Sequence, residues 1–164
     1  MKGMDIMSIK TKRLLLREFK TNDAKQFYEI SNDENVKEYL SYLYCEFIED
    51  AYEFMEYIYE NDEKQGHYII ENKNKQIIGI ITYESIFKKE MEFSIVIGDK
   101  FRGNAYASEA ILGLMEFFKT QNYNLVYKVI CSKSNKMSIK MINKLKPKSK
   151  ILMFDKSFET FIIS

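Results

Sequence analysis

The sequence predicts an α/β (α+β) fold over residues 1–164 as a single domain, with a mixed, mainly antiparallel central sheet of roughly six to seven strands flanked by about four helices. Strand-like segments come first along the chain, and a strand–helix–strand–helix–strand series follows. With 164 residues, 46% of them hydrophobic and 30% charged, the chain is long enough for one hydrophobic core. No linker or internal repeat divides it.

The N-terminal third of the chain predicts one strand and two helices. Residues 11–19 alternate apolar and polar side chains, as a half-buried strand does. Residues 22–32 have helical periodicity, with Thr21 or Asn22 as the capping residue. Residues 48–61 place their apolar side chains at helical spacing, so a second helix is expected there.

The middle of the chain predicts three strands. Two strands at residues 67–71 and 76–83 flank the polar turn 72–75, which indicates a hairpin. A third strand is expected at residues 90–97, because its apolar and polar residues alternate.

The C-terminal part predicts two helices and two or three strands. A long helix is expected at residues 105–121 and a shorter one at 136–145. The segment 125–131 is rich in β-forming residues and predicts a strand. The tail from Ile151 is expected to add one or two more.

The connection between the strand at 90–97 and the helix at 105–121 has the composition of an anion-binding turn. The first amides of a helix lack internal partners and carry the positive end of its dipole. Gly103 has no Cβ to keep a ligand away. Gly98 and Gly103 have the P-loop spacing, but Asn104 follows where a P-loop needs Lys, and no G-x-G-x-x-G pattern is present. The turn therefore suggests a phosphate-bearing ligand, with a diphosphate favoured.

Residues 100–105, Lys-Phe-Arg-Gly-Asn-Ala, resemble the acetyl-CoA pyrophosphate loop of the GNAT superfamily of N-acetyltransferases, Gln/Arg-x-x-Gly-x-Gly/Ala. The residues that follow, Tyr106-Ala107 and Glu109-Ala110, make the resemblance closest to the ribosomal-protein-alanine (RimJ/RimL-type) branch. Lys100 departs from the pattern: it keeps a charge but loses the planar donor geometry. Ala105 replaces the second glycine, which the pattern permits.

The resemblance covers most of the chain. Residues 11–17 resemble the first strand of the family, 76–81 an inner strand, and 92–95 the strand before the loop. Residues 135–145 resemble the family's Asn-x-x-Ser to Lys-Leu segment. Beyond residue 145 the match fails, because Lys-Pro stands where the family has Gly-Phe.

The resemblance implies an acyltransferase in which a primary amine attacks acetyl-CoA directly within a ternary complex. The amine would be a protein N-terminus, a polyamine or another small amine. The alternative is a non-catalytic acyl-CoA-binding or interaction module on the same fold. The divergent tail favours that alternative, as does Ile142, which stands where many members have Tyr.

Matching positions give the residues expected to hold acetyl-CoA, the co-substrate. Backbone amides of the loop would bind the pyrophosphate, and the preceding strand would pair with the pantetheine arm. The amide near Ile95 or Val96 would be the oxyanion donor. The residues are Ile95, Val96, Ile97, Arg102, Gly103, Asn104, Ala105, Tyr106, Ala107 and Asn135. Asn135 has a second interpretation, as the cap of the helix that follows it.

Two residues are the catalytic candidates. Glu92 matches the family's Glu, and a carboxylate, often acting through water, can take the proton of the amine. Its other interpretation is an exposed edge carboxylate, and Glu84 and Asp99 are weaker alternatives as the base. Ser138 would hydrogen-bond the leaving sulfur, or it is a plain helix-start hydroxyl. His67, the only histidine, is expected to be an ordinary sheet residue.

The net charge of +1 hides two segments of opposite sign. Residues 29–63 hold twelve acids, one base and several tyrosines, which would favour a cationic amine acceptor, or else form a solvated face. Residues 128–150 hold eight lysines and no acid, which would attract coenzyme phosphates, or else form a solvated face. Because no arginine lies among these lysines, a specific nucleic-acid site is not expected.

The sequence also limits location and assembly. No apolar run reaches the ~18 residues of a membrane span, so no membrane partner is expected. No signal-peptide pattern opens the chain, so a cytoplasmic protein is expected. Cys45 and Cys131 are too few for a disulfide framework and are expected to be reduced, with no metal site. A monomer or homodimer is expected.

Overall fold

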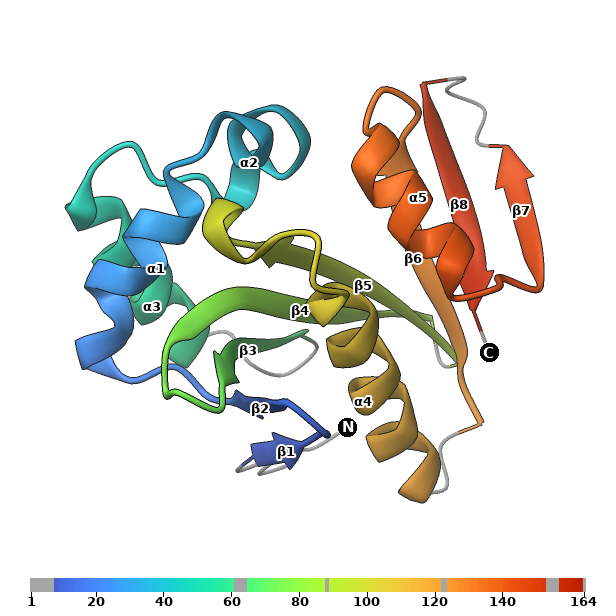
Figure 1. The fold of residues 1–164 in the computed structure, drawn as a ribbon, viewed down its shortest axis with the longest axis horizontal. Helices are drawn as coiled ribbons and strands as arrows, with labels where there is room; N and C mark the ends of the chain where they lie inside the picture. Colours follow the sequence, from blue (N-terminus) through green and yellow to red (C-terminus); the bar gives the residue numbers. More distant parts are fainter. Residues whose placement is uncertain (1–7, 61–64, 88, 122–123, 153–156, 164) are drawn as a thin grey trace.

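The computed structural model of the chain describes residues 8–60, 65–87, 89–121, 124–152 and 157–163. In these ranges the strands form one sheet of eight, in the order β1-β2-β3-β4-β5-β6-β8-β7 (Figure 1). The strands are β1 (Ser8–Lys10), β2 (Leu14–Arg17), β3 (Gln65–Asn72), β4 (Ile77–Phe87), β5 (Glu90–Ile97), β6 (Val126–Ser132), β7 (Ser149–Leu152) and β8 (Phe158–Ile163). Every neighbouring pair is antiparallel except β5 and β6, which are parallel.

Five α-helices and three short 3₁₀ turns complete the described part. The helices are α1 (Ala24–Ser31), α2 (Glu34–Tyr39), α3 (Ile48–Glu60), α4 (Tyr106–Thr120) and α5 (Lys136–Lys144). The 3₁₀ turns are η1 (Thr21–Asp23), η2 (Ser41–Leu43) and η3 (Asp99–Phe101). The predicted fold class is confirmed, and the strand at residues 90–97 has the predicted bounds.

The structure has one strand more than the upper end of the prediction, because residues 8–17 form two strands. Thr11 closes the turn between them: its amide donates to the Leu14 carbonyl at 2.9 Å. The sequence analysis also missed α2, a six-residue helix whose N-cap, Asp33, accepts a hydrogen bond from the Asn35 amide. So short a helix shows too few turns for its periodicity to be recognised.

The predicted cap of the first long helix is wrong. Residues 21–23 form η1, and Asp23, not Thr21 or Asn22, is the N-cap of α1. Asp23 is buried because its carboxylate accepts hydrogen bonds from the Lys20 amide at 2.7 Å and from the Arg17 guanidinium at 2.7 and 3.0 Å. This local network shifts the helix start by two residues.

The two faces of the sheet carry separate hydrophobic cores. Adjacent strand residues alternate between them: Ile69 and Ile80 pack with α1 and α3, whereas Ile70 and Ile81 pack with α4. Figure 1 shows α4 lying across one face of the sheet. The same alternation continues along β5, so consecutive residues of this strand face opposite sides of the molecule.

The sheet opens between β5 and β6. The parallel pairing joins residues 90–93 to residues 126–129 and stops there. Residues 94–97 pair only with β4, while β6 continues its ladder with β8 as far as Ser132. The two strands therefore meet at one end and diverge at the other (Figure 1), and the loop before α4 begins beside this opening.

Candidate active site

The loop from β5 to α4 has a backbone shaped to receive a ligand. Gly103 has a φ of +82°, and a Cβ added to it would meet no atom within 4 Å. Ala105, the N-cap of α4, is left-handed with a φ of +61°, and no side chain caps the helix. The first amides of α4 are thus left to a ligand, as an anion site at a helix N-terminus requires.

The Arg102 side chain holds this loop in place. Its Nε donates to the Ile97 carbonyl at 2.9 Å, and its terminal nitrogens lie 3.0 Å from the Asp33 carboxylate and 3.1 Å from that of Asp99. The Asn104 amide group adds hydrogen bonds to two loop carbonyls. Because these side chains bind the protein itself, the contribution of residues 102–104 to a ligand is limited to their backbone.

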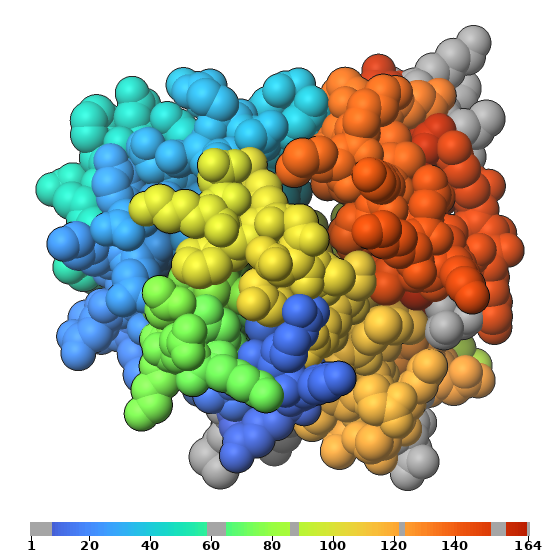
Figure 2. Space-filling model, viewed as in Figure 1, coloured from blue at the N-terminus to red at the C-terminus, as the bar shows by residue number. Residues whose placement is uncertain are grey.

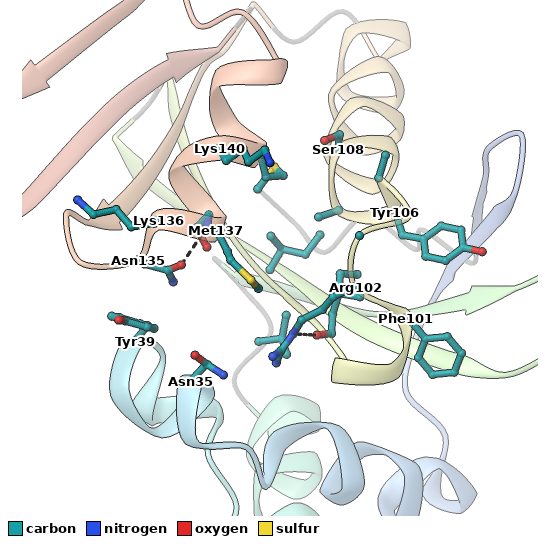
Figure 3. A pocket seen from close by; sticks show the side chains of 18 of the residues that line it. Asn35, Tyr39, Phe101, Arg102, Tyr106, Ser108, Asn135, Lys136, Met137 and Lys140 are labelled. Carbon is teal, nitrogen blue, oxygen red and sulfur yellow. Dashed lines mark hydrogen bonds between the residues drawn. The ribbon is translucent and has the colours of Figure 1, made fainter.

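The loop borders a cavity of about 610 Å³. Its walls come from β5, the loop, the first turn of α4, α2 and α5 (Figure 3). Of the predicted coenzyme residues, all but Asn104 line it: Ile95, Val96, Ile97, Arg102, Gly103, Ala105, Tyr106, Ala107 and Asn135. Figure 2 shows the surface hollowed between the loop before α4, in yellow, and α5, in orange.

The hydrogen bonds of β5 show which of its backbone groups face the opening. The Gly98 amide donates to the Ile78 carbonyl at 2.9 Å, so alternate residues of β5 bond to β4. By this alternation Val96 faces β4, in register with Ile80, while Ile95 and Ile97 face away from it. Of the two amides expected as the oxyanion donor, those of Ile95 and Val96, the Ile95 amide is therefore the one directed toward the opening.

The opposite wall of this cavity is the start of α5. The Ser138 amide donates to the Asn135 side chain at 3.0 Å, so the capping role expected for Asn135 is confirmed. Ser138 also lines the cavity and lies within hydrogen-bonding reach of Cys131, whose pKa is raised by burial. Three lysines spaced four residues apart line the cavity from α5: Lys136, Lys140 and Lys144.

The structure places Glu92 in a second cavity, of about 420 Å³, instead of the first. Ser94 lies in it too, while Ile95, Val96 and Ile97 line the first cavity, so neighbouring residues of β5 contribute to both. Burial raises the pKa of Glu92, the nearby Glu84 carboxylate raises it further, and Lys128 opposes the shift. A carboxyl whose proton is held more firmly than usual is suited to accept a proton from an amine.

Asp99, His67 and the two cysteines lie in three different surroundings. Asp99, weighed as a base, lies beside the Arg102 guanidinium with a side chain 79% exposed. His67 is a buried residue of β3, where burial lowers its pKa to about 4, so it is neutral at pH 7. Both cysteines are free and buried.

The sequence analysis missed five of the residues around Glu92: Phe54, Gln65, Thr82, Tyr83 and Ser94. Tyr42 and Tyr57 belong to the acidic, tyrosine-containing segment 29–63, which was expected to favour a cationic acceptor. The second cavity is also lined by Tyr42, Phe54, Tyr57, Gln65, His67, Thr82, Tyr83, Glu84 and Ser94. A signal for part of this set was present, because β3, β4 and β5 are consecutive antiparallel strands whose like-facing residues must lie side by side.

Within the described ranges, no cluster of His, Cys, Asp and Glu side chains has the arrangement of a metal site. No helix in the described part is long and apolar enough to cross a membrane. The uncapped start of α4 beside an opened sheet defines an α/β protein with a site for a phosphate-bearing ligand.

The family follows from comparison with known proteins. The acetyltransferase (GNAT) domain matches residues 13–147, and the chain belongs to this family. It is therefore an acetyl-CoA-dependent N-acetyltransferase. The site fits this co-substrate, because no side chain caps the first amides of α4 and the space beside Gly103 is open, so a diphosphate can approach these donors.

Individual proteins are similar to this chain in sequence or in fold. The chain is 29% identical over 141 residues to the uncharacterized N-acetyltransferase YnaD of Bacillus subtilis, covering 85% of this chain and 81% of that protein. Its fold is similar to that of RimL, a ribosomal L7/L12 alpha-N-protein acetyltransferase solved with coenzyme A, with a TM-score of 0.78, 14% identity and coverage of 95% and 98%. It is also similar to spermidine N-acetyltransferase from Vibrio cholerae, solved with CoA and spermine, with a TM-score of 0.70, 15% identity and coverage of 93% and 94%.

Proposed function

We propose that this chain transfers the acetyl group of acetyl-CoA to a primary amine, namely a protein N-terminus, a polyamine or another small amine, by direct attack in a ternary complex. One observation carries the proposal. Beside the opening of the sheet, β5 contributes to the first cavity through Ile95, and three residues earlier it contributes to the second, carboxylate-lined cavity through Glu92. Two substrates can thus approach one strand from different sides. The pattern of residues 102–110 supports a relation to the RimJ/RimL-type branch.

The loop and α5 have the binding role. Backbone amides of residues 103–107 hold the diphosphate, with the N-terminal end of the α4 dipole behind them. The Arg102 amide, also expected to take part, donates to the Asp99 carbonyl at 3.2 Å instead. The edge of β5 at Ile95 and Ile97 pairs with the extended arm of the co-substrate, and Asn135 contacts that arm from the other wall. Acetyl-CoA supplies the activated thioester.

Glu92 is the base, and the Ile95 amide is the oxyanion donor. An amine with a pKa near 10 is mostly protonated at pH 7, so a carboxylate must take its proton, directly or through water, before the nitrogen attacks. Charge then develops on the thioester oxygen, where a fixed N–H donor contributes about 3 kcal/mol. Ser138, at the α5 wall, hydrogen-bonds the departing sulfur.

The test is the rate of thiol release from acetyl-CoA with a panel of primary amines. Glu92→Gln is expected to lower kcat by about 10²–10⁴-fold, because the proton acceptor is lost. The affinity for acetyl-CoA, measured by isothermal titration, is expected to stay within about twofold, because Glu92 lies outside the loop cavity.

Glu116→Gln is the matched control, because Glu116 is an exposed acid on α4 at the far face of the sheet. It is expected to retain the wild-type rate. Wild-type protein that binds acetyl-CoA and releases no thiol with any amine would show a non-catalytic acyl-CoA-binding module instead. Unchanged kcat in Glu92→Gln would exclude Glu92 as the base.

A further inference from the structure

The floor of the second cavity is built from two rows of side chains that cross three strands. Register places each row on one face of β3, β4 and β5. The first row is Gln65, Glu84 and Glu92, and the second is His67, Thr82 and Ser94. Every residue of both rows is polar, in a sheet whose other inner positions are mostly apolar.

We propose that this cavity binds an acceptor with two positive charges, in which Glu92 receives the reacting amine and Glu84 holds a second cationic nitrogen. The inference rests on the proposed transfer to a primary amine and adds the class of amine. The shared chemistry is a dication, whether a small diamine or polyamine, or an N-terminus followed by a basic side chain.

The pairing of the two carboxylates favours a bound positive charge between them. Glu84 and Glu92 are direct partners in the β4–β5 ladder, so their Cβ atoms are about 4.5–5.5 Å apart, and like charges in that position repel. The nearest cation, Lys128, is in register with Glu92 but forms its salt bridge with Glu90 at 2.6 Å. Among the described residues, neither Glu84 nor Glu92 has an ion pair. A bound dication would supply both missing charges.

The walls of the cavity suit a cation as well. Tyr42 and Tyr57 are about half exposed, at 54% and 50%, and present aromatic rings that attract cations. The buried His67 is neutral at pH 7 and so adds no positive charge; its Nδ1 has no hydrogen-bond partner among the described residues. The Tyr42 hydroxyl lies 3.4 Å from Thr82 Oγ1, so the end of this side chain is beside the second row.

The positions of Glu92 and Glu84 in the sheet give the two carboxylates different roles. Glu92 lies on β5, the strand that borders the opening, only three residues before Ile95. Glu84 lies on β4, one strand further from the opening. The amine beside Glu92 is therefore the one that meets the thioester, and Glu84 serves as the specificity residue.

The experiment compares 1,4-diaminobutane with butylamine, and alanyl-lysine amide with alanyl-leucine amide, as acceptors. Wild-type protein is expected to have a higher kcat/KM for the dication of at least one pair, by about tenfold. Glu84→Gln is expected to remove that preference, and Glu116→Gln to keep it. The pair that responds identifies whether a free diamine or a chain end is the source of the dication.

Binding gives a readout independent of catalysis. Titration of 1,4-diaminobutane and of alanyl-lysine amide into the protein saturated with coenzyme A is expected to show binding that Glu84→Gln weakens about tenfold and that added salt weakens. If no amine is acetylated but this Glu84-dependent binding remains, the transfer function fails and the dication site stands. Turnover or binding with equal preference in wild type and Glu84→Gln would overturn the dication site and leave the transfer function intact.

Discussion

Ala105 shows how a single residue sets the geometry of the coenzyme loop. Its φ of +61° and ψ of 19° lie in the left-handed region, which costs a non-glycine residue about 1–2 kcal/mol. The family pattern has Gly or Ala there, and the left-handed backbone explains why glycine is favoured at this position. The left-handed residue turns the chain so that the amides of α4 face the cavity.

Ala105→Gly is expected to raise the free energy of unfolding by about 0.5–1 kcal/mol, because glycine relieves the strain and loses only part of that gain to chain entropy. Ala107→Gly is the matched control: Ala107 is helical, and there the change is expected to lower stability by about 0.5–1 kcal/mol. Urea unfolding of the three proteins measures both. Equal destabilisation by the two substitutions would show that Ala105 is not strained.

At the scale of elements, α5 presents lysines along the cavity that the loop before α4 borders. Lys136, Lys140 and Lys144 recur every four residues, so they share one side of the helix, and all three line the cavity. Figure 3 shows Lys140 and Met137 on the side of α5 that faces the loop before α4, while the Lys136 side chain extends from the start of the helix away from Arg102. Of the two interpretations of the lysine-rich segment, attraction of coenzyme phosphates is favoured for these three lysines.

Replacing both Lys136 and Lys140 by Gln is expected to raise the Kd for acetyl-CoA about tenfold at low salt, since each exposed charge contributes about 0.5–1 kcal/mol. The effect is expected to shrink to about twofold at 0.5 M salt, where the Debye length is only a few Å. Lys12→Gln, an exposed lysine outside the cavity, is the control. A loss of affinity that is independent of salt would mean that these lysines act through packing instead of charge.

The element scale also shows where prediction from sequence ends. Alternation gave the bounds of β5, and glycine with its neighbours gave the loop, because both signals are local. The opening beside residues 94–97 is not local, since it depends on how far β6 follows β5. For the same reason Glu92 and Glu84 were named separately as possible bases, while their direct pairing required the register of β4 against β5.

At the scale of the whole molecule, Glu109 joins the N-terminal hairpin to α4. Its Oε1 accepts hydrogen bonds from the Thr11 hydroxyl at 2.6 Å and the Arg13 amide at 2.7 Å, and its Oε2 lies 2.6 Å from Arg13 Nε. Burial raises the pKa of Glu109, but the hydrogen bonds from Thr11 and Arg13 outweigh it and leave the pKa below its usual range. A residue of the family pattern thus has a structural role.

Glu109→Gln is expected to lower the free energy of unfolding by about 2 kcal/mol at pH 7, because charge-assisted hydrogen bonds are lost. The folded pKa is depressed, so this stabilisation is present above the unfolded pKa of about 4.5 and is lost as pH falls through the folded pKa. The difference between wild type and variant in urea unfolding should therefore narrow from pH 7 to pH 3. Glu116→Gln is expected to differ from wild type by less than about 0.5 kcal/mol at both pH values. A Glu109→Gln difference that does not change with pH would contradict this linkage.

The opening in the sheet has a consequence for cooperativity. Strands β1 to β5 and strands β6 to β8 are joined, within the sheet, by four residue pairs at one end of β5 and β6. A ligand that spans the opening contacts β5 on one side and the start of α5, which follows β6 in the chain, on the other, so it binds only when the two groups of strands are assembled. The binding free energy then stabilises the assembly of β1 to β5 with β6 to β8. The apparent melting temperature of the protein therefore depends on ligand concentration.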